Sequence, residues 1–176
     1  LAENVTWRQT TETGVTATVD LRDGLTFHDG QALTAADVVF TYRFLADTSM
    51  GTGDINVPAP RYRGRTSLVE SVERLDDRTV RFGFGETTED VAVRALTTPI
   101  LPAHVWETKT GSANLAGIDI SEGITQALVW ANPEPVGSGP LRFESKTPGE
   151  ELVLARFDDH QLLGDGPGQF DVPFEQ

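Results

Sequence analysis

Apolar and polar residues alternate along several short segments of this chain, which predicts β-strands. Between Val15 and Leu21 every second residue is apolar and the residues between them are Thr or Asp, as in a strand with one buried face. Two further pairs of alternating segments are each joined by a short turn, which predicts two hairpins. The hairpin strands are predicted at residues 68–75 and 79–84 and at 141–145 and 151–157, with short separate strands at 25–27 and 170–174.

A helical period of apolar residues begins after Thr34. Val38, Tyr42 and Leu45 recur at the spacing of one helix face, which predicts a helix from residue 34 to about 46. Its start carries a capping pattern, because the Thr34 hydroxyl can accept a bond from a free amide and the Asp37 carboxylate can bond back to Thr34. Shorter helices are predicted at 87–96, 102–106 and 120–130, and irregular segments at 50–65 and 132–139.

Two Asp-Gly pairs, Asp23-Gly24 and Asp29-Gly30, predict tight turns in which glycine adopts a positive φ. Together, these elements predict an α+β fold with a mostly antiparallel sheet and short helices. The predicted core is made of apolar residues from the strands and the first helix. These are Val15, Val19, Leu21, Val38, Tyr42, Leu45, Val80, Phe82, Leu141, Phe143, Leu152 and Leu154.

Charge narrows the possible partners of this chain. It has 176 residues and a formal net charge of −13, so phosphate backbones repel it and nucleic acid is not an expected partner. The chain has no cysteine, which excludes disulfides, thiolate metal sites and thiol catalysis. No apolar run approaches the roughly 20 residues that cross a bilayer.

The cations are unevenly divided between lysine and arginine. Lys109 and Lys146 are the only lysines among 14 basic residues. Acidic excess with so little lysine favours a protein from a halophile, haloarchaeal or other, because concentrated salt screens the repulsion between its carboxylates. The alternative is an ordinary acidic protein from a genome rich in G and C, which also favours arginine.

Three motifs could suggest catalysis or metal binding, and each has a simpler structural interpretation. His28 and Asp29 are adjacent on an extended segment, so they point to opposite sides and do not form a catalytic pair. The acidic residues around 70–77 and 86–90 lack a calcium-loop pattern and are expected to be solvated. Residues 136–140 lack the Gly-x-Ser-x-Gly pattern of a nucleophile. The sequence therefore predicts no catalytic residue, no metal site and no cofactor.

The order of these segments resembles the family 5 extracellular solute-binding proteins, which serve ABC importers for dipeptides, oligopeptides and nickel. The longest similarity is GVTATVDLRDGLTFHDG at residues 14–30 followed by LTAADVVF at 33–40. Weaker similarities follow in the family order at residues 72–82, 100–104, 136–143 and 152–159. The chain departs from the family pattern at Ser138, where Thr is usual, at Leu141, where Tyr is usual, and at 158–161, where the family has Asn-x-x-Tyr-Trp.

The resemblance implies a periplasmic-binding-protein-like fold of class II, in which two lobes close on a solute. Residues 1–135 are then expected to be the small subdomain of the first lobe, and 136–176 a linker with the first strands that return to the main part of that lobe. The chain is expected to be a piece of a longer protein. That protein is expected outside the cell, at the cell surface or in the periplasm, with a membrane anchor.

The function that the resemblance implies is capture of a small solute, most simply a peptide, and its delivery to an ABC permease in the membrane. No bond is made or broken. The alternative is a hydrolase that uses surface carboxylates, although the sequence offers no nucleophile with a base beside it.

Four residues are candidates for contact with the solute. Arg61, Tyr62 and Arg63 form a basic and aromatic cluster on the segment that follows the first helix, where Tyr62 could stack on the solute and an arginine could pair with a carboxylate. Thr98 precedes the Ile100–His104 segment, which in the family passes near the solute cleft. The alternative for all four is a structural role at the surface.

Overall fold

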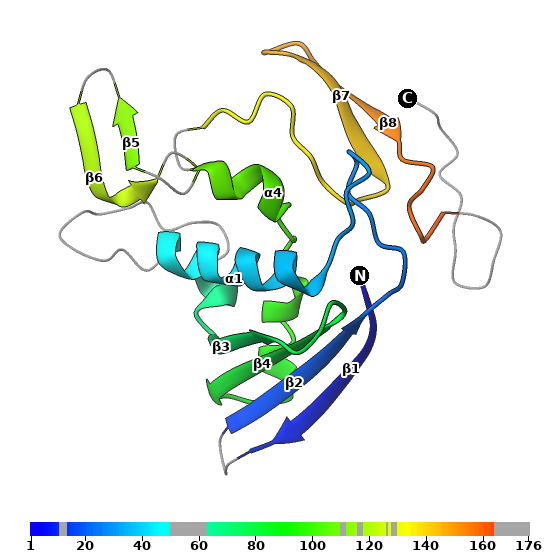
Figure 1. The fold of residues 1–176 in the computed structure, drawn as a ribbon, viewed down its shortest axis with the longest axis vertical. Coiled ribbons are helices and arrows are strands. Elements are labelled where there is room, and N and C mark those ends of the chain that lie inside the picture. The colour runs from blue at the N-terminus through cyan, green and yellow to red at the C-terminus, as the bar shows by residue number, and fades with distance from the viewer. Residues whose placement is uncertain are drawn as a thin grey trace. The chain divides into compact units, whose positions relative to one another are not determined.

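Four strands of the N-terminal half form an antiparallel sheet in the computed structural model of the chain (Figure 1). They are β1 (Ala2–Gln9), β2 (Gly14–Leu21), β3 (Val69–Arg74) and β4 (Thr79–Glu86), in the order β1-β2-β4-β3. The structure describes residues 1–10, 14–49, 63–109, 112–115, 118–125, 127 and 130–163. Within them, residues 1–22 and 34–130 form one compact unit, and 23–33 with the chain from 131 onward form a second.

The register of the sheet places the apolar residues of neighbouring strands opposite one another. Val19 of β2 faces Val80 of β4, and Ala17 faces Phe82. The residues that alternate with them along β2 are only partly buried, which confirms the predicted half-buried strand. Strand β1 was not predicted from the sequence, and it pairs with β2 along most of its length.

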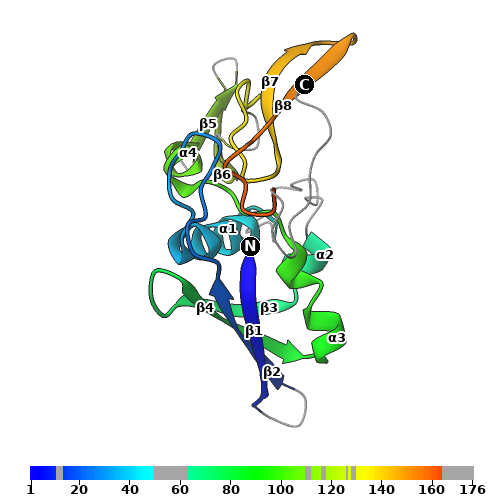
Figure 2. The same ribbon diagram turned by 90° about the vertical axis from the view of Figure 1, so that its right-hand side faces the viewer.

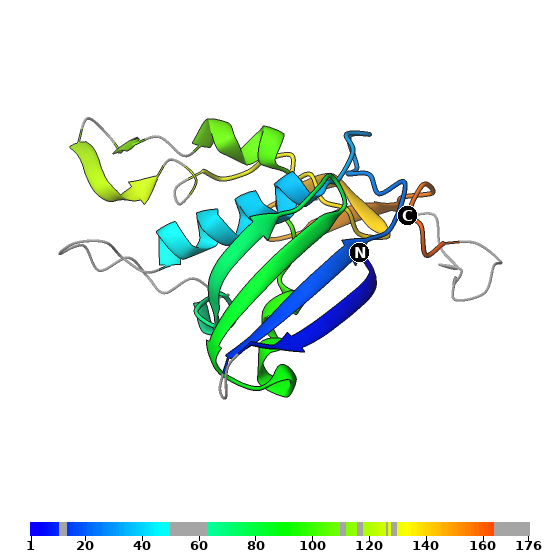
Figure 3. The same ribbon diagram turned by 60° about the horizontal axis from the view of Figure 1, so that its bottom comes forward.

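The helix α1 (Ala35–Ser49) runs along one side of this sheet (Figure 3). Tyr42 meets Phe82 of β4 edge to face, with ring centroids 4.9 Å apart, and Val38 and Leu45 are also buried. Such aromatic pairs add to the stability that burial of apolar area gives. The predicted core is therefore confirmed for its first eight residues, from Val15 to Phe82.

The start of α1 carries the predicted capping box. The Thr34 amide donates to Oδ2 of Asp37 at 2.9 Å, and the Ala36 amide donates to the Thr34 hydroxyl at 3.3 Å. Both bonds satisfy donors that have no partner within the helix. The helix continues three residues beyond the predicted end at 46.

Short elements complete the first unit (Figure 2). Helix α4 follows Pro102, as predicted. Between β4 and α4 the predicted helix 87–96 is divided into two shorter pieces, and Thr88 makes no side-chain cap to the first of them. The elements are α2 (Arg63–Thr66), α3 (Glu89–Ala92), η1 (Ala95–Thr97), α4 (Ala103–Trp106), η2 (Glu107–Lys109), β5 (Ser112–Leu115) and β6 (Ile118–Thr125).

Two sequence predictions in this unit were wrong. The predicted helix 120–130 is strand β6 up to Thr125, because Ile118 and Ile120 alternate with polar residues and pair with β5. Helical spacing and strand alternation are hard to separate in so short a segment. The predicted irregular segment 50–65 ends in helix α2 from Arg63. Residues 50–62 and the predicted strand 170–174 lie outside the described part of the chain.

The second unit contains the predicted C-terminal hairpin. Strand β7 (Leu141–Thr147) pairs antiparallel with β8 (Glu151–Arg156), and Gly149 between them has a φ of 80°. Leu152 is 58% exposed rather than part of the core, and Leu141, Phe143 and Leu154 are only half-buried. A two-stranded hairpin has too little area to bury both of its faces.

Both Asp-Gly turns of the second unit form as predicted. Gly24 has a φ of 67° and Gly30 a φ of 83°, which residues with a Cβ rarely adopt. The strand predicted at 25–27 is reduced to a single bridge between Thr26 and Ala32. Among the helices that the structure describes, none is long and apolar enough to cross a bilayer.

Candidate functional site

Thr98, a predicted contact residue, lies in a segment that three polar side chains of α1 hold in place. The first is Asp37, which is only 6% exposed. Its Oδ2 accepts the Thr34 amide and hydroxyl, while its Oδ1 accepts the amide of Ala103 at 3.0 Å. Since Ala103 is the first residue of α4, one carboxylate caps two helices.

The second and third are Thr41 and Tyr42 in the next turn of α1. The buried Thr41 hydroxyl donates to the Asp37 carbonyl at 2.7 Å and accepts the amide of Leu101 at 2.9 Å. The Tyr42 hydroxyl donates to the Ala95 carbonyl at 2.6 Å. The segment from Ala95 to Ala103 is therefore attached to α1 at three points along its length.

Thr98 itself is 4% exposed, and its hydroxyl donates to the Ala95 carbonyl at 2.8 Å. The same carbonyl accepts the Tyr42 hydroxyl, so the two side chains meet at one backbone oxygen. Burial raises the pKa of Tyr42 to about 12, although the Thr98 hydroxyl and the charge of Arg65 both act to lower it. The phenol stays protonated at neutral pH and can donate this bond.

Arg65 links helix α2 to this group. Its guanidinium donates to the Thr97 carbonyl at 3.0 Å. Helix α2, which begins at Arg63, therefore lies beside the segment that carries Thr98. Arg61 and Tyr62 lie outside the described residues, and of Arg63 only the backbone is described. Arg65 was not among the predicted site residues, and its basic neighbours were the only sequence signal near it.

The hollow that Thr98 helps to line is small, with a volume of about 80 Å³. Its walls are mainly apolar and include Val5, Val19, Val38, Tyr42 and Phe82. Sites for small molecules usually enclose about 300–1,000 Å³. The described part of the first unit thus gives Thr98 no space in which to hold a peptide by itself.

Larger hollows in each unit are lined by charged residues. One of about 510 Å³ lies along α1 and is bordered by Phe40, Phe44, Arg43 and, on η2, Glu107. Another, of about 410 Å³, lies in the second unit beside His28 and Arg142. Among the residues described here, no group of three or more His, Asp or Glu side chains is arranged to hold a metal ion.

The sequence predicts that the side chains of His28 and Asp29 point away from each other, and they do so in the structure. Both ring nitrogens of His28 face the backbone of residues 137–139, whereas Oδ1 of Asp29 accepts the Gln31 amide at 3.1 Å. Histidine and carboxylate thus both hold backbone in place. This geometry gives no base with a nucleophile beside it.

The geometry around Thr98 is that of a scaffold that positions the backbone segment from Ala95 to Ala103. The model of bacterial extracellular solute-binding proteins, family 5 middle region, matches residues 1–171. The chain belongs to this family. Its members are binding proteins rather than enzymes, and extracellular by the family's definition.

The similarity extends to individual relatives. The oligopeptide-binding protein AppA of Bacillus subtilis is 30% identical over 153 residues, which cover 84% of this chain and 24% of AppA. The structure of the ABC transporter substrate-binding protein CtaP of Listeria monocytogenes matches with a TM-score of 0.64 and 32% identity, over 92% of this chain and 28% of CtaP. The family 5 chain thus spans about a quarter of the length of its relatives.

A solved complex gives the same result for the fold. The structure of B. subtilis AppA with a nonapeptide matches 91% of this chain and 28% of AppA, with a TM-score of 0.60 and 25% identity. The predicted α+β fold with mainly antiparallel pairing is confirmed, and its match to a minor part of larger binding proteins agrees with part of one lobe.

Proposed function

We propose that this chain belongs to the substrate-binding component of an ABC importer, which captures a peptide outside the cell and delivers it to a membrane permease. The observation that carries this proposal is the family match over residues 1–171. The likeness to AppA, which was solved with a nonapeptide, supports a peptide as the solute. In the full-length protein, residues 1–135 belong to the small subdomain of the first lobe, and 136–176 lead to the main part of that lobe. We also propose that the full-length protein carries a membrane anchor.

The proposed site lies between this region and the part of the protein that the chain does not include. One wall of this site is formed by Arg61, Tyr62, Arg63 and Thr98. Because the hollow beside Thr98 is too small for a peptide, the second wall lies in another part of the protein. A solute held on one side only loses much of its buried area but still carries the cost of association. Affinity therefore depends on both walls.

Calorimetry with a panel of di- and oligopeptides tests this proposal. We expect the 176-residue chain to bind none of them more tightly than about 1 mM, which corresponds to about −4 kcal/mol. The product of the whole gene is expected to bind at least one at micromolar concentration. In that product Tyr62→Ala is expected to weaken binding about tenfold or more. Leu152→Ala, an apolar truncation at an exposed position, is the matched control.

Micromolar binding by the 176-residue chain alone would place the complete site within these residues. Full affinity in the Tyr62→Ala protein would remove Tyr62 from the site while leaving the importer role in place. Absence of binding by the whole gene product across peptides would contradict the proposed solute class.

The excess of acidic residues supports a halophilic source. The chain has a net charge of −13, and its carboxylates repel one another. This repulsion acts over a Debye length of about 30 Å at 0.01 M salt and only about 3 Å at 1 M salt. We expect the melting temperature to rise steadily from 10 mM to molar potassium chloride, as measured by circular dichroism. A melting temperature that stays constant over this range would contradict a halophilic origin.

A further inference from the structure

The ring of His28 joins two segments of the second unit that are distant in sequence. His28 belongs to the turn that ends at Gly30, and Gly137 belongs to the connection that precedes β7. The His28 amide donates to the Gly137 carbonyl at 2.8 Å. The ring makes two further bonds to the same connection, so three hydrogen bonds link these segments through one residue.

The partners of the ring determine where its proton lies. The amide of Gly137 donates to Nδ1 at 3.2 Å, so Nδ1 carries no hydrogen. The Gly139 carbonyl is 2.9 Å from Nε2 and can only accept, so Nε2 carries the hydrogen. Both bonds exist together in just one tautomer of the neutral imidazole. A doubly protonated ring presents a hydrogen to the Gly137 amide and loses that bond.

The surroundings leave the ring little freedom to turn. Phe157 meets it edge to face, with centroids 4.9 Å apart. A Cβ built on Gly137 would lie 3.2 Å from Cε1 of the ring, closer than ordinary van der Waals contact. A Cβ on Gly139 meets nothing within 4 Å. Glycine at 137 therefore lets the backbone approach the ring closely enough to donate to it.

We propose that His28 is a proton-sensitive latch that fastens the turn at Asp29-Gly30 to the Gly137–Gly139 connection when the ring is neutral and releases Gly137 when the ring is doubly protonated. The proposal stands apart from solute binding, because every contact that carries it lies within the second unit. Histidine is the side chain that normally changes charge between pH 5 and 8.

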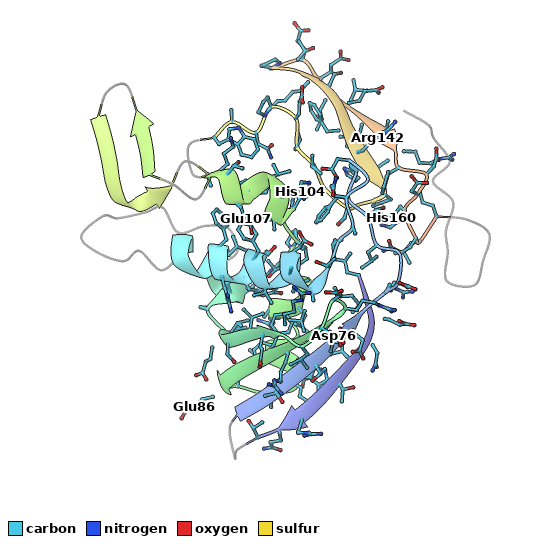
Figure 4. All side chains as sticks on the ribbon, viewed as in Figure 1. Asp76, Glu86, His104, Glu107, Arg142 and His160 are labelled. Carbon is cyan, nitrogen blue, oxygen red and sulfur yellow. The ribbon has the colours of Figure 1, made fainter. Side chains whose placement is uncertain are left out.

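Charged residues line the hollow beside His28. Asp29 follows it in the turn, Glu134 lies on the connection, and Arg142 and Glu144 lie on β7. His160 follows β8 (Figure 4). Burial lowers the pKa of His160, and the charge of His28 contributes to that lowering. Glu134 and Glu144 line the same hollow as the ring, whereas the Asp29 carboxylate accepts the Gln31 amide.

Nuclear magnetic resonance of the ¹⁵N-labelled chain tests the latch. Ring nitrogen shifts of the three histidines, His28, His104 and His160, report the protonation state of each between pH 8 and pH 5. Amide exchange, expressed as protection so that the intrinsic pH effect is removed, reports the bond at Gly137. The amide of Leu33 is the internal control, since it donates to the Leu25 carbonyl at 2.9 Å in the same unit.

We expect the protection of Gly137 to fall about tenfold as His28 becomes doubly protonated, because one hydrogen bond is lost. Leu33 is expected to keep its protection. In His28→Ala the protection of Gly137 is expected to be low at both pH values. In His160→Gln, which removes the neighbouring titrating ring, the pH dependence at Gly137 is expected to persist.

The latch is overturned if the His28 ring remains in its singly protonated form down to pH 5. It is equally overturned if the ring becomes doubly protonated while the protection of Gly137 stays constant, or if His28→Ala leaves that protection intact. If His28→Ala also loses protection at Leu33, the variant has not folded correctly. In that case the latch is tested by the unsubstituted chain alone, through the change in Gly137 protection as His28 becomes doubly protonated.

Discussion

Replacement of Asp37 by alanine is expected to lower the free energy of unfolding by about 3 kcal/mol. The buried carboxylate accepts two bonds from Thr34 and one from the Ala103 amide. In Asp37→Ala the amides of Thr34 and Ala103 lose a charged acceptor at places that are partly shielded from water. Hydrogen bonds to charged groups contribute about 1.5–3 kcal/mol each, and they are not additive here because they share one carboxylate.

Denaturant unfolding, followed by circular dichroism, measures this loss. Asp90→Ala is the control, because Asp90 also lies in the first turn of a helix but is exposed, and it is expected to cost no more than about 0.5 kcal/mol. A loss below about 1 kcal/mol for Asp37→Ala would mean that Asp37 acts only as a local cap, since removal of a cap costs about that much. It would then contribute nothing through α4.

The contacts of Asp37 show what the sequence could predict and what it could not. The capping pattern at Thr34 and Asp37 lies within four residues, so the sequence predicts it, together with a cost of about 0.5–1 kcal/mol for loss of Asp37 alone. The bond to Ala103 joins residues 66 positions apart. No local pattern indicates such a contact. The larger loss of about 3 kcal/mol that we expect for Asp37→Ala depends on it.

The same distinction holds for the elements of the fold. The Asp-Gly turns and both hairpins were predicted correctly, because turn residues and alternation act over a few positions. Strand β6 was predicted as a helix, and its identity depends on pairing with β5. Strand β1 was missed for a similar reason, since its pairing with β2 stabilises it and its own residues are mostly exposed.

The candidate site was less predictable than the fold. Thr98 was singled out through the resemblance to the family, but the burial of its hydroxyl against Ala95 could not be read from the chain. Tyr42 was predicted as a core residue from helical spacing, which says nothing about where its hydroxyl points. The bond between Arg65 and the Thr97 carbonyl closes a gap of 32 residues. Prediction of such contacts requires the packing of α1 and α2 against the segment after β4.

The buried hydroxyl of Tyr42 is expected to make the stability of the fold fall steeply at alkaline pH. Burial raises its pKa from 10 to about 12, so between these values the folded chain holds a proton that the unfolded chain has lost. Stability from this group is therefore fully present below pH 10 and is lost as the pH rises toward 12. Two pKa units correspond to about 2–3 kcal/mol.

The Tyr42→Phe variant separates this effect from other alkaline effects. At pH 8 it is expected to be less stable than the unsubstituted chain by about 1 kcal/mol, because the bond to the Ala95 carbonyl is lost. Near pH 12 the order is expected to reverse, since phenylalanine has no proton to lose. Denaturant unfolding at several pH values measures both differences.

A direct titration of the phenol provides the second measurement. The chain has two tyrosines, so in Tyr62→Phe the ultraviolet absorbance of tyrosinate reports Tyr42 alone. We expect its midpoint well above pH 10 in the folded chain and close to 10 in denaturant. A midpoint near 10 in both states, with equal pH dependence of stability in Tyr42→Phe and the unsubstituted chain, would show that the hydroxyl reaches water. The attachment of Ala95 to α1 through Tyr42, and with it the support that α1 gives to Thr98, would then be wrong.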